Sequence, residues 1–410
     1  VVAPTALLQY HNLIFILNNT SILKLNYMKI RLLHFFKLTL ALLLFVQVGY
    51  SQEAQNSSCI GRTVLNSTGG TTAANGIKIV TSGAGNMQVF RLNAFQIFAD
   101  NLDTGTSAPF VSTGPVNKTL LMIGNTFFST NSTTYYNPTG LTNGGAFTIV
   151  SNTCQASVGP VGGTQQNTVR LKAVSGGLNY FLNIIFNYVY PNDFLTITYQ
   201  VEIPATNTQT VKLAHGFDTY LAGGDYGQGF VRGTAPYLSV GAQKTGAFEA
   251  FNYISGVPWS GYYSAVYGSL YDDLGSDGKF NNTVNTALID NGMGISMDFG
   301  STPGTYSSVS TLSFSCAAPT TAPSLGSSVS NACPATTANL NSLYTGTLAS
   351  GIELRWFKST GEPYTTPTQA VAGSYYAVFY DTVGSCYSPA SAAVTVTATT
   401  CCPTAAPTVN

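Results

Sequence analysis

Charged side chains are scarce in this sequence. Only 8% of its 410 residues are Asp, Glu, Lys or Arg, and the formal net charge is zero. Four of the sixteen basic residues and none of the sixteen acidic residues precede Gln52, so the part from Gln52 onward carries a net charge of −4. A mildly acidic surface without a Lys/Arg cluster argues against nucleic acid and anionic membranes as partners.

Histidines and long apolar runs are also scarce. His215 is the only histidine after Gln52, which excludes zinc sites that pair cysteines with several histidines. Val211, Leu213 and His215 share one face of an expected strand, so His215 is predicted to be packed rather than catalytic. No nucleophile elbow or other catalytic constellation is recognisable, so the chain is predicted not to be an enzyme and to need no cofactor, calcium apart.

An export signal follows Met28. Basic residues come first, then an apolar run over residues 38–46, then small residues at the positions that a signal peptidase reads. This order predicts a signal peptide over residues 28–51 that is cleaved before Gln52, with residues 1–27 as upstream read-through. The apolar run is too short to span a membrane, so the mature chain is expected to be secreted, at the bacterial cell surface, without membrane insertion.

Strand-forming and turn-forming residues are abundant. Hydrophobic residues make up 44% of the chain and glycine is frequent, which favours an all-β fold. Alternate residues from Ile197 to Ile203 are apolar, as in a strand with one buried face, and the apolar run 180–190 fits a strand covered on both faces. Residues 52–317 are therefore predicted to form a large β-sandwich, with two fused sandwiches as the alternative.

Two similar Pro/Thr/Ala-rich stretches, at residues 319–325 and 403–409, lie 84 residues apart. Stretches of this kind behave as stiff linkers between domains. They predict a domain over residues 318–402 and the start of a further repeat or linker at residues 403–410.

Strand signals and the order Cys333, Trp356, Cys386 indicate an immunoglobulin-like β-sandwich in the second domain. A disulfide between Cys333 and Cys386 is predicted, although Cys386 lies beyond the aromatic strand and the bridge would differ from the standard one between sheets. The partners of the remaining cysteines stay open: Cys59, Cys154, Cys316, Cys401 and Cys402.

Residues 333–336, 354–356, 373–376 and 386–390 carry a resemblance to a known family. They are similar to the Ig-like repeats of Bacteroidetes, or flavobacterial, cell-surface proteins. The resemblance implies secretion, often by the type IX route, and tandem repeats that act as spacers or adhesive modules.

The segment around Asp273 and Asp277 partly matches a calcium-binding loop, with oxygen ligands at alternate positions and glycines that allow a sharp turn. Gly275 stands where a further acidic ligand is expected, and Val284 stands where a glutamate should close the loop. A solvated turn is the alternative to a weak calcium site.

Aromatic and acidic residues provide the best ligand-binding candidates. Trp259, Tyr262 and Tyr263 could stack on sugar rings, and the alternative is that they belong to the core. Half of the acidic residues lie between positions 218 and 298, and among them Asp218 and Asp225 could accept hydrogen bonds from a ligand.

Together these features predict an adhesion or binding protein that recognises glycans or cell-surface and matrix polymers through residues 52–317. The alternatives are a carbohydrate-binding module of a polysaccharide-utilisation protein and, less favoured, a polysaccharide lyase or hydrolase.

Overall fold

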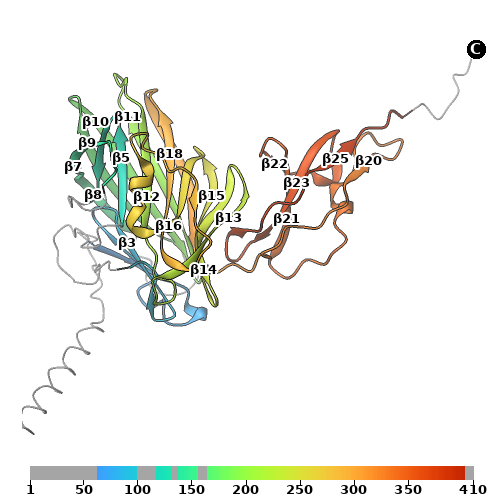
Figure 1. The fold of residues 1–410 in the computed structure, drawn as a ribbon, viewed down its shortest axis with the longest axis horizontal. Helices are drawn as coiled ribbons and strands as arrows, with labels where there is room; N and C mark the ends of the chain where they lie inside the picture. Colours follow the sequence, from blue (N-terminus) through green and yellow to red (C-terminus); the bar gives the residue numbers. More distant parts are fainter. Residues whose placement is uncertain (1–61, 99–116, 131–136, 156–163, 402–410) are drawn as a thin grey trace, which may run out of the picture. The chain divides into compact units, whose positions relative to one another are not determined.

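The structure is a computed structural model that describes residues 62–98, 117–130, 137–155 and 164–401. The described residues form an all-β protein (Figure 1), as predicted. Their helical elements are short 3₁₀ turns of three or four residues: η1 (Ala73–Asn75), η2 (Tyr267–Ser269), η3 (Asp272–Leu274), η4 (Leu340–Leu343) and η5 (Pro367–Gln369). No helix in these ranges is long and apolar enough to cross a membrane. The predictions for residues 1–27, 28–51 and 403–410 lie outside the described residues.

Two sheets that share one hydrophobic core form the main body. We call them sheet I and sheet II. The strand order of sheet I is β7 (Thr142–Ala146), β6 (Thr126–Ser129), β5 (Lys118–Ile123), β12 (Val211–Asp218), β18 (Ile289–Gly300), β16 (Trp259–Val266) and β17 (Thr283–Val284). The strand order of sheet II is β13 (Tyr226–Thr234), β14 (Tyr237–Lys244), β15 (Ala247–Gly256), β19 (Gly304–Ser313), β11 (Phe194–Ile203), β10 (Leu178–Val189), β9 (Thr164–Ser175) and β8 (Thr148–Gln155). The two sheets are joined where Tyr226 of β13 pairs with Asp290 of β18.

The core lies between the two sheets because each strand buries alternate side chains. On β11 every second residue from Leu195 to Ile203 is buried, which confirms the alternation predicted there. Ile295 from sheet I and Phe251 from sheet II belong to the same core cluster. The prediction that β10 is covered on both faces is wrong, because the residues on its outer face, such as Phe181, are only half-buried. The guanidinium of Arg170 lies over the Phe181 ring, 4.2 Å from its centroid.

A small sheet completes the body. It contains β1 (Arg62–Leu65), β2 (Lys78–Ser82), β3 (Met87–Arg91) and β4 (Ala94–Phe95) in sequence order. Leu65, Ile79 and Val89 add their side chains to the core between sheets I and II. A second cluster, which includes Leu270 and Phe280, packs the segment after β16 against the outer face of sheet I.

The C-terminal sheet has the strand order β20 (Ser328–Ser330), β25 (Val394–Thr397), β23 (Gly373–Asp381), β21 (Ile352–Lys358) and β22 (Pro363–Tyr364), with β24 (Cys386–Tyr387) paired to β23. Trp356 and Tyr375 anchor one small core cluster and Phe357 another. The strands expected around Trp356 and Val394 are present. The immunoglobulin-like arrangement and the domain boundaries stay predictions.

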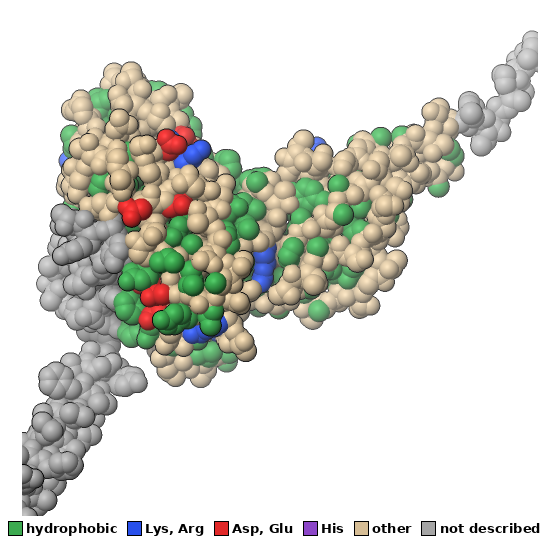
Figure 2. All heavy atoms as spheres, viewed as in Figure 1, with side chains coloured by type: hydrophobic (Ala, Val, Ile, Leu, Met, Phe, Trp, Pro, Cys, Tyr) green, Lys and Arg blue, Asp and Glu red, His purple; other side chains and the backbone are tan. Residues whose placement is uncertain are grey.

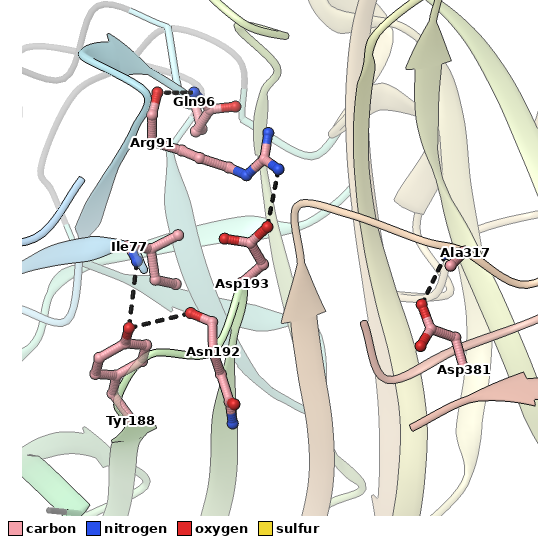
Figure 3. Close-up of polar contacts among 8 residues, drawn as sticks. All are labelled: Ile77, Arg91, Gln96, Tyr188, Asn192, Asp193, Ala317 and Asp381. Carbon is pink, nitrogen blue, oxygen red and sulfur yellow. Dashed lines mark hydrogen bonds and ion pairs between the residues drawn. The ribbon is translucent and has the colours of Figure 1, made fainter. Parts of the chain in front are cut away.

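The disulfides differ from the predicted one. Cys386 is bonded to Cys316, and Cys333 is bonded to Cys401, so the predicted Cys333–Cys386 pair is wrong. Strand pairing explains this: β20 and β25 run in parallel, so the chain segments that follow them bring Cys333 next to Cys401. Cys386 lies on β24 opposite Asp381 of β23. The carboxylate of Asp381 accepts a hydrogen bond at 2.7 Å from the backbone nitrogen of Ala317 (Figure 3), which brings the neighbouring Cys316 to Cys386.

Candidate functional site

The aromatic residues predicted to bind glycans lie on one strand, β16, but they do not form a single exposed surface. Trp259 packs against the main core and donates from Nε1 to the Ser310 hydroxyl at 3.1 Å. Tyr263 is buried in the cluster on sheet I, and this burial, followed by nearby acidic charge, raises its pKa to about 12. Tyr262 is half-buried. A common stacking surface is therefore not formed, and glycan binding by these residues stays a prediction.

His215 lies in the main core, as predicted. It is fully buried, and its Nδ1 is hydrogen-bonded to the hydroxyl of Tyr199 on sheet II. Its ring also makes an edge contact with Phe251 at 5.7 Å between centroids. Burial lowers the pKa of His215 to about 3, so the imidazole is neutral near pH 7 and is enclosed by protein rather than open to a substrate.

Glu249 is a buried acid that the sequence analysis did not select. It lies on β15, both of its carboxylate oxygens are buried, and neither has a hydrogen-bond partner among the described residues. Burial, and then the charge of Asp218, raises the pKa of Glu249 well above its ordinary value. Asp218 is itself only 4% exposed. Both carboxyl groups are therefore enclosed by the protein, and in this conformation neither is open to a solvent-borne substrate.

The other predicted acid, Asp225, is half-buried at the junction of the two sheets. Its backbone carbonyl accepts a hydrogen bond from the amide of Asn291, and its charge, after burial, raises the pKa of the neighbouring Asp290. The structure thus places Asp225 and Asp218 in the same part of the sandwich but apart from Trp259, which packs toward Ser310.

The predicted calcium loop is closed by its own hydrogen bonds. The carboxylate of Asp273 accepts from the backbone of Asn281 at 2.8 Å and from the hydroxyl of Thr283 at 2.6 Å. The ammonium of Lys212 donates to the backbone oxygen of Asp277 at 2.6 Å. Because the Asp273 oxygens hold the turn and a cation already lies at Asp277, this arrangement fits the turn better than the calcium site, which stays a prediction.

A pocket of about 650 Å³, here called the polar pocket, lies where three loops of the sandwich meet. The loops connect β5 to β6, β9 to β10 and β11 to β12. The lining residues are uncharged: Ile123, Gly124, Asn125, Thr126, Ser175, Gly176, Leu178, Tyr180, Thr206, Thr208 and Gln209. The lining therefore presents hydroxyl and amide groups beside small apolar surfaces.

Asn207 holds the longest of these loops in place. Its side-chain nitrogen donates to the backbone oxygens of Gln209 and Ser301, each at 2.7 Å, and its side-chain oxygen accepts from the hydroxyl of Tyr180 at 2.6 Å. Gly124 has a positive φ of 55°, which a residue with a side chain rarely adopts. A Cβ there would also meet the Gln209 side-chain oxygen at 2.5 Å, so a larger residue at this position would displace the end of the Gln209 side chain from the pocket wall.

Comparison with known proteins gives structural likeness alone. No protein-family model and no curated protein matches the chain. A bacterial glucoamylase complexed with acarbose is similar with a TM-score of 0.38 and 11% identity over 65% of this chain and 33% of that one. A mutant heparan sulfate lyase from Pedobacter heparinus is similar with a TM-score of 0.34 and 9% identity over 78% of this chain and 39% of that one. The chain thus spans between a third and two fifths of the length of these two proteins.

A protein from Escherichia coli K12 assigned as an aldose 1-epimerase is similar with a TM-score of 0.33 and 11% identity over 62% of this chain and 99% of that one. These structures are carbohydrate-processing enzymes. The prediction of a non-catalytic adhesion or binding protein is therefore corrected, because the solved structures similar to the chain are enzymes rather than adhesins. At these TM-scores and identities the likeness is one of β architecture.

Proposed function

We propose that this chain is part of a carbohydrate-processing enzyme and that it contacts its carbohydrate at the polar pocket. The observation that carries the proposal is the chemistry of the lining. Hydroxyl and amide side chains can both donate and accept hydrogen bonds, as the hydroxyl groups of a sugar require. Ile123 and Leu178 add apolar surface for the C–H faces of a sugar ring.

The size and rigidity of the pocket support the same proposal. Its volume lies in the range of about 300–1,000 Å³ that is usual for small-molecule sites. The hydrogen bonds of Asn207 order the loop before any ligand arrives, which lowers the entropy lost on binding. The pocket supports the carbohydrate-binding part of this proposal, and the conversion assay described below tests the enzymatic part.

Export is part of the proposal. Two disulfides form among the described residues, and disulfides persist in oxidising compartments. Together with the signal-peptide pattern after Met28, they support an enzyme that acts outside the cytoplasm. The resemblance of residues 319–402 to Bacteroidetes surface repeats would fit such a location and stays a prediction.

The proposal is tested by incubating the chain with a panel of neutral and acidic oligosaccharides. Binding is measured by calorimetry, and conversion is followed by NMR of the products. Asn125→Ala and Gln209→Ala should each weaken the binding of the best ligand by about 3- to 10-fold, because each removes a hydrogen-bonding group.

Gln228→Ala is the matched control, since Gln228 is an exposed amide on β13 outside the polar pocket. Its ligand affinity should equal that of the unmodified chain. The proposal fails if no carbohydrate in the panel is bound or converted, or if the pocket variants bind as tightly as the control.

A further inference from the structure

A second pocket, which we call the basic pocket, gathers cations in a chain that has few. It has a volume of about 300 Å³ and lies where β14 ends, β15 begins and β19 ends, beside Arg91 of the small sheet. Arg91, Arg232 and Lys244 line it, together with the rings of Phe248 and Phe314, and no acidic residue does. Figure 2 shows how thinly charged side chains are spread over one face of the molecule.

Strand pairing assembles this pocket. Arg232 on β13 lies beside β14, whose residue Gln243 pairs with Phe248 on β15. The Arg232 guanidinium lies over the ring of Phe230, at 4.4 Å from its centroid, and also over the ring of Phe248, at 5.6 Å. It donates to the Gln243 side chain at 2.6 Å. The planar group is thereby held in one orientation by aromatic faces and one amide.

Arg232 is a buried cation that has no acidic partner among the described residues. It is only 7% exposed, and burial lowers its pKa. Among the ion pairs between described residues, none includes Arg232 or Lys244. A buried charge is costly unless an opposite charge compensates it. An anion in the pocket would supply that charge.

Arg91 forms the other side of the pocket. Its Nη2 is paired with Asp193 at 2.8 Å, which fixes the side chain (Figure 3). Its Nε is buried and has no hydrogen-bond partner among the described residues. Within the described part of the chain, the pocket therefore combines one ion-paired guanidinium with a guanidinium and an ammonium that have no acidic partner.

We propose that the basic pocket binds the anionic group of an acidic saccharide, a carboxylate or a sulfate ester, with Arg232 and Lys244 as the charged donors and Phe248 beside the sugar ring. Guanidinium groups bind carboxylate and sulfur or phosphorus oxyanions through parallel N–H donors, and aromatic rings pack against sugars. This inference rests on the proposed function and adds a charge preference to it.

The two pockets can be tested separately because β11 separates them. Thr206 of the polar pocket follows the last residue of β11, and Asp193, the partner of Arg91, precedes the first. A strand of ten residues is about 30 Å long, so one sugar ring cannot fill both pockets. Loss of one site should leave the other intact.

The experiment measures the affinity of the chain for three oligosaccharides of equal length, one neutral, one of uronic acids and one sulfated, and for inorganic sulfate. Arg232→Gln and, as a more exposed alternative, Lys244→Gln should each weaken binding of at least one acidic oligosaccharide by about 10-fold or more, because each removes a charge-assisted hydrogen bond. Binding of the neutral oligosaccharide should be unchanged. The uronic acid and the sulfated ligand identify which anion the pocket accepts.

Arg170→Gln is the matched control, because Arg170 lies on β9 of the same sheet and is already paired with Glu202. This substitution should leave the affinity for the acidic oligosaccharides unchanged. The inference is overturned if all three variants weaken the binding of acidic oligosaccharides equally. It is also overturned if Arg232→Gln and Lys244→Gln have native melting profiles and bind the acidic oligosaccharides as tightly as the unmodified chain. Binding of the neutral oligosaccharide at the polar pocket is unaffected by either outcome. Inorganic sulfate bound as tightly as the sulfated oligosaccharide would also overturn it.

Discussion

The main sandwich and the C-terminal sheet are stabilised in different ways. One large apolar cluster joins sheet I, sheet II and the small sheet, whereas the C-terminal sheet has two small clusters. Each of the two described disulfides has a cysteine in the C-terminal sheet or its flanks. Small units bury too little apolar surface to be stable by packing alone, and covalent links then compensate. Core truncation should therefore affect mainly the first region, and reduction mainly the second.

The largest expected effect is a core truncation in the main sandwich. Ile295→Ala should lower the free energy of unfolding by about 2–5 kcal/mol, because Ile295 is fully buried between the sheets and its removal leaves a cavity. Chemical denaturation provides the measurement. Leu288→Ala, at a residue that is 59% exposed, should change the free energy of unfolding by less than about 0.5 kcal/mol. Similar losses in both variants would contradict the described core.

Acid should destabilise the main sandwich through His215. The pKa of this imidazole falls from 6.5 to about 3 on folding. Between these two pH values the imidazole is protonated in the unfolded chain and neutral in the folded chain. The resulting stability is complete above pH 6.5 and is lost as the pH falls toward 3, by about 5 kcal/mol in all. Denaturant titrations between pH 5 and 6.5 measure this effect when the unmodified chain is compared with a His215 variant, because Glu249, whose pKa is raised on folding, changes stability in the opposite sense over the same range.

His215→Gln removes the titrating group, so the contribution of His215 to the slope of stability against pH should be missing from the variant over that range. Its absolute stability will be lower, because the contact with Tyr199 changes. The slope against pH is therefore the decisive quantity. An unchanged slope in the variant would show that His215 is not buried in its neutral form.

The disulfide between Cys333 and Cys401 should matter for the C-terminal sheet. Replacing both cysteines with serine should destabilise that sheet by about 2–4 kcal/mol, because the bond restricts a long loop in the unfolded chain. Hydrogen exchange of the β23 and β25 amides should rise, while amides of β11 in the main sandwich keep their protection. Increased exchange in both regions would show that the disulfide stabilises the main sandwich as well as the C-terminal sheet.

The smallest expected effect concerns a partly exposed ion pair on sheet II. Arg170 and Glu202 are paired at 2.5 Å, with side chains that are 29% and 32% exposed. Arg170→Gln should cost roughly 0.5–1 kcal/mol, since solvent screens such pairs. The loss should shrink in high salt. A cost comparable with that of Ile295→Ala would mean that surface charge, rather than packing, stabilises this sheet.

Much of the fold follows from local patterns. The alternation from Ile197 to Ile203 predicted a strand with one buried face, and β11 has that face. The apolar run that forms β10 predicted a strand covered on both faces, but Phe181 and Ile185 lie half-buried on the outer face, where Arg170 covers Phe181. Apolar character alone does not reveal which side of a sheet is covered.

The pockets were beyond the reach of the sequence analysis. Asn125 and Gln209 lie on different loops, and no local pattern marks them as neighbours. Arg232 and Lys244 do not form a charge cluster along the chain, so the sequence does not mark them as a basic patch. Their common feature, a position on one edge or face of sheet II, exists only after the strands have paired.

The sequence by itself determined an all-β chain with buried alternating faces, a packed histidine and a second strand-rich region after residue 318, because side-chain alternation and turn residues act locally. Tertiary structure alone decided the cysteine pairs, the burial of Glu249 beside Asp218, and the gathering of uncharged groups in one pocket and cations in another. These features depend on strand register and sheet order, which are set by contacts between residues far apart in the chain.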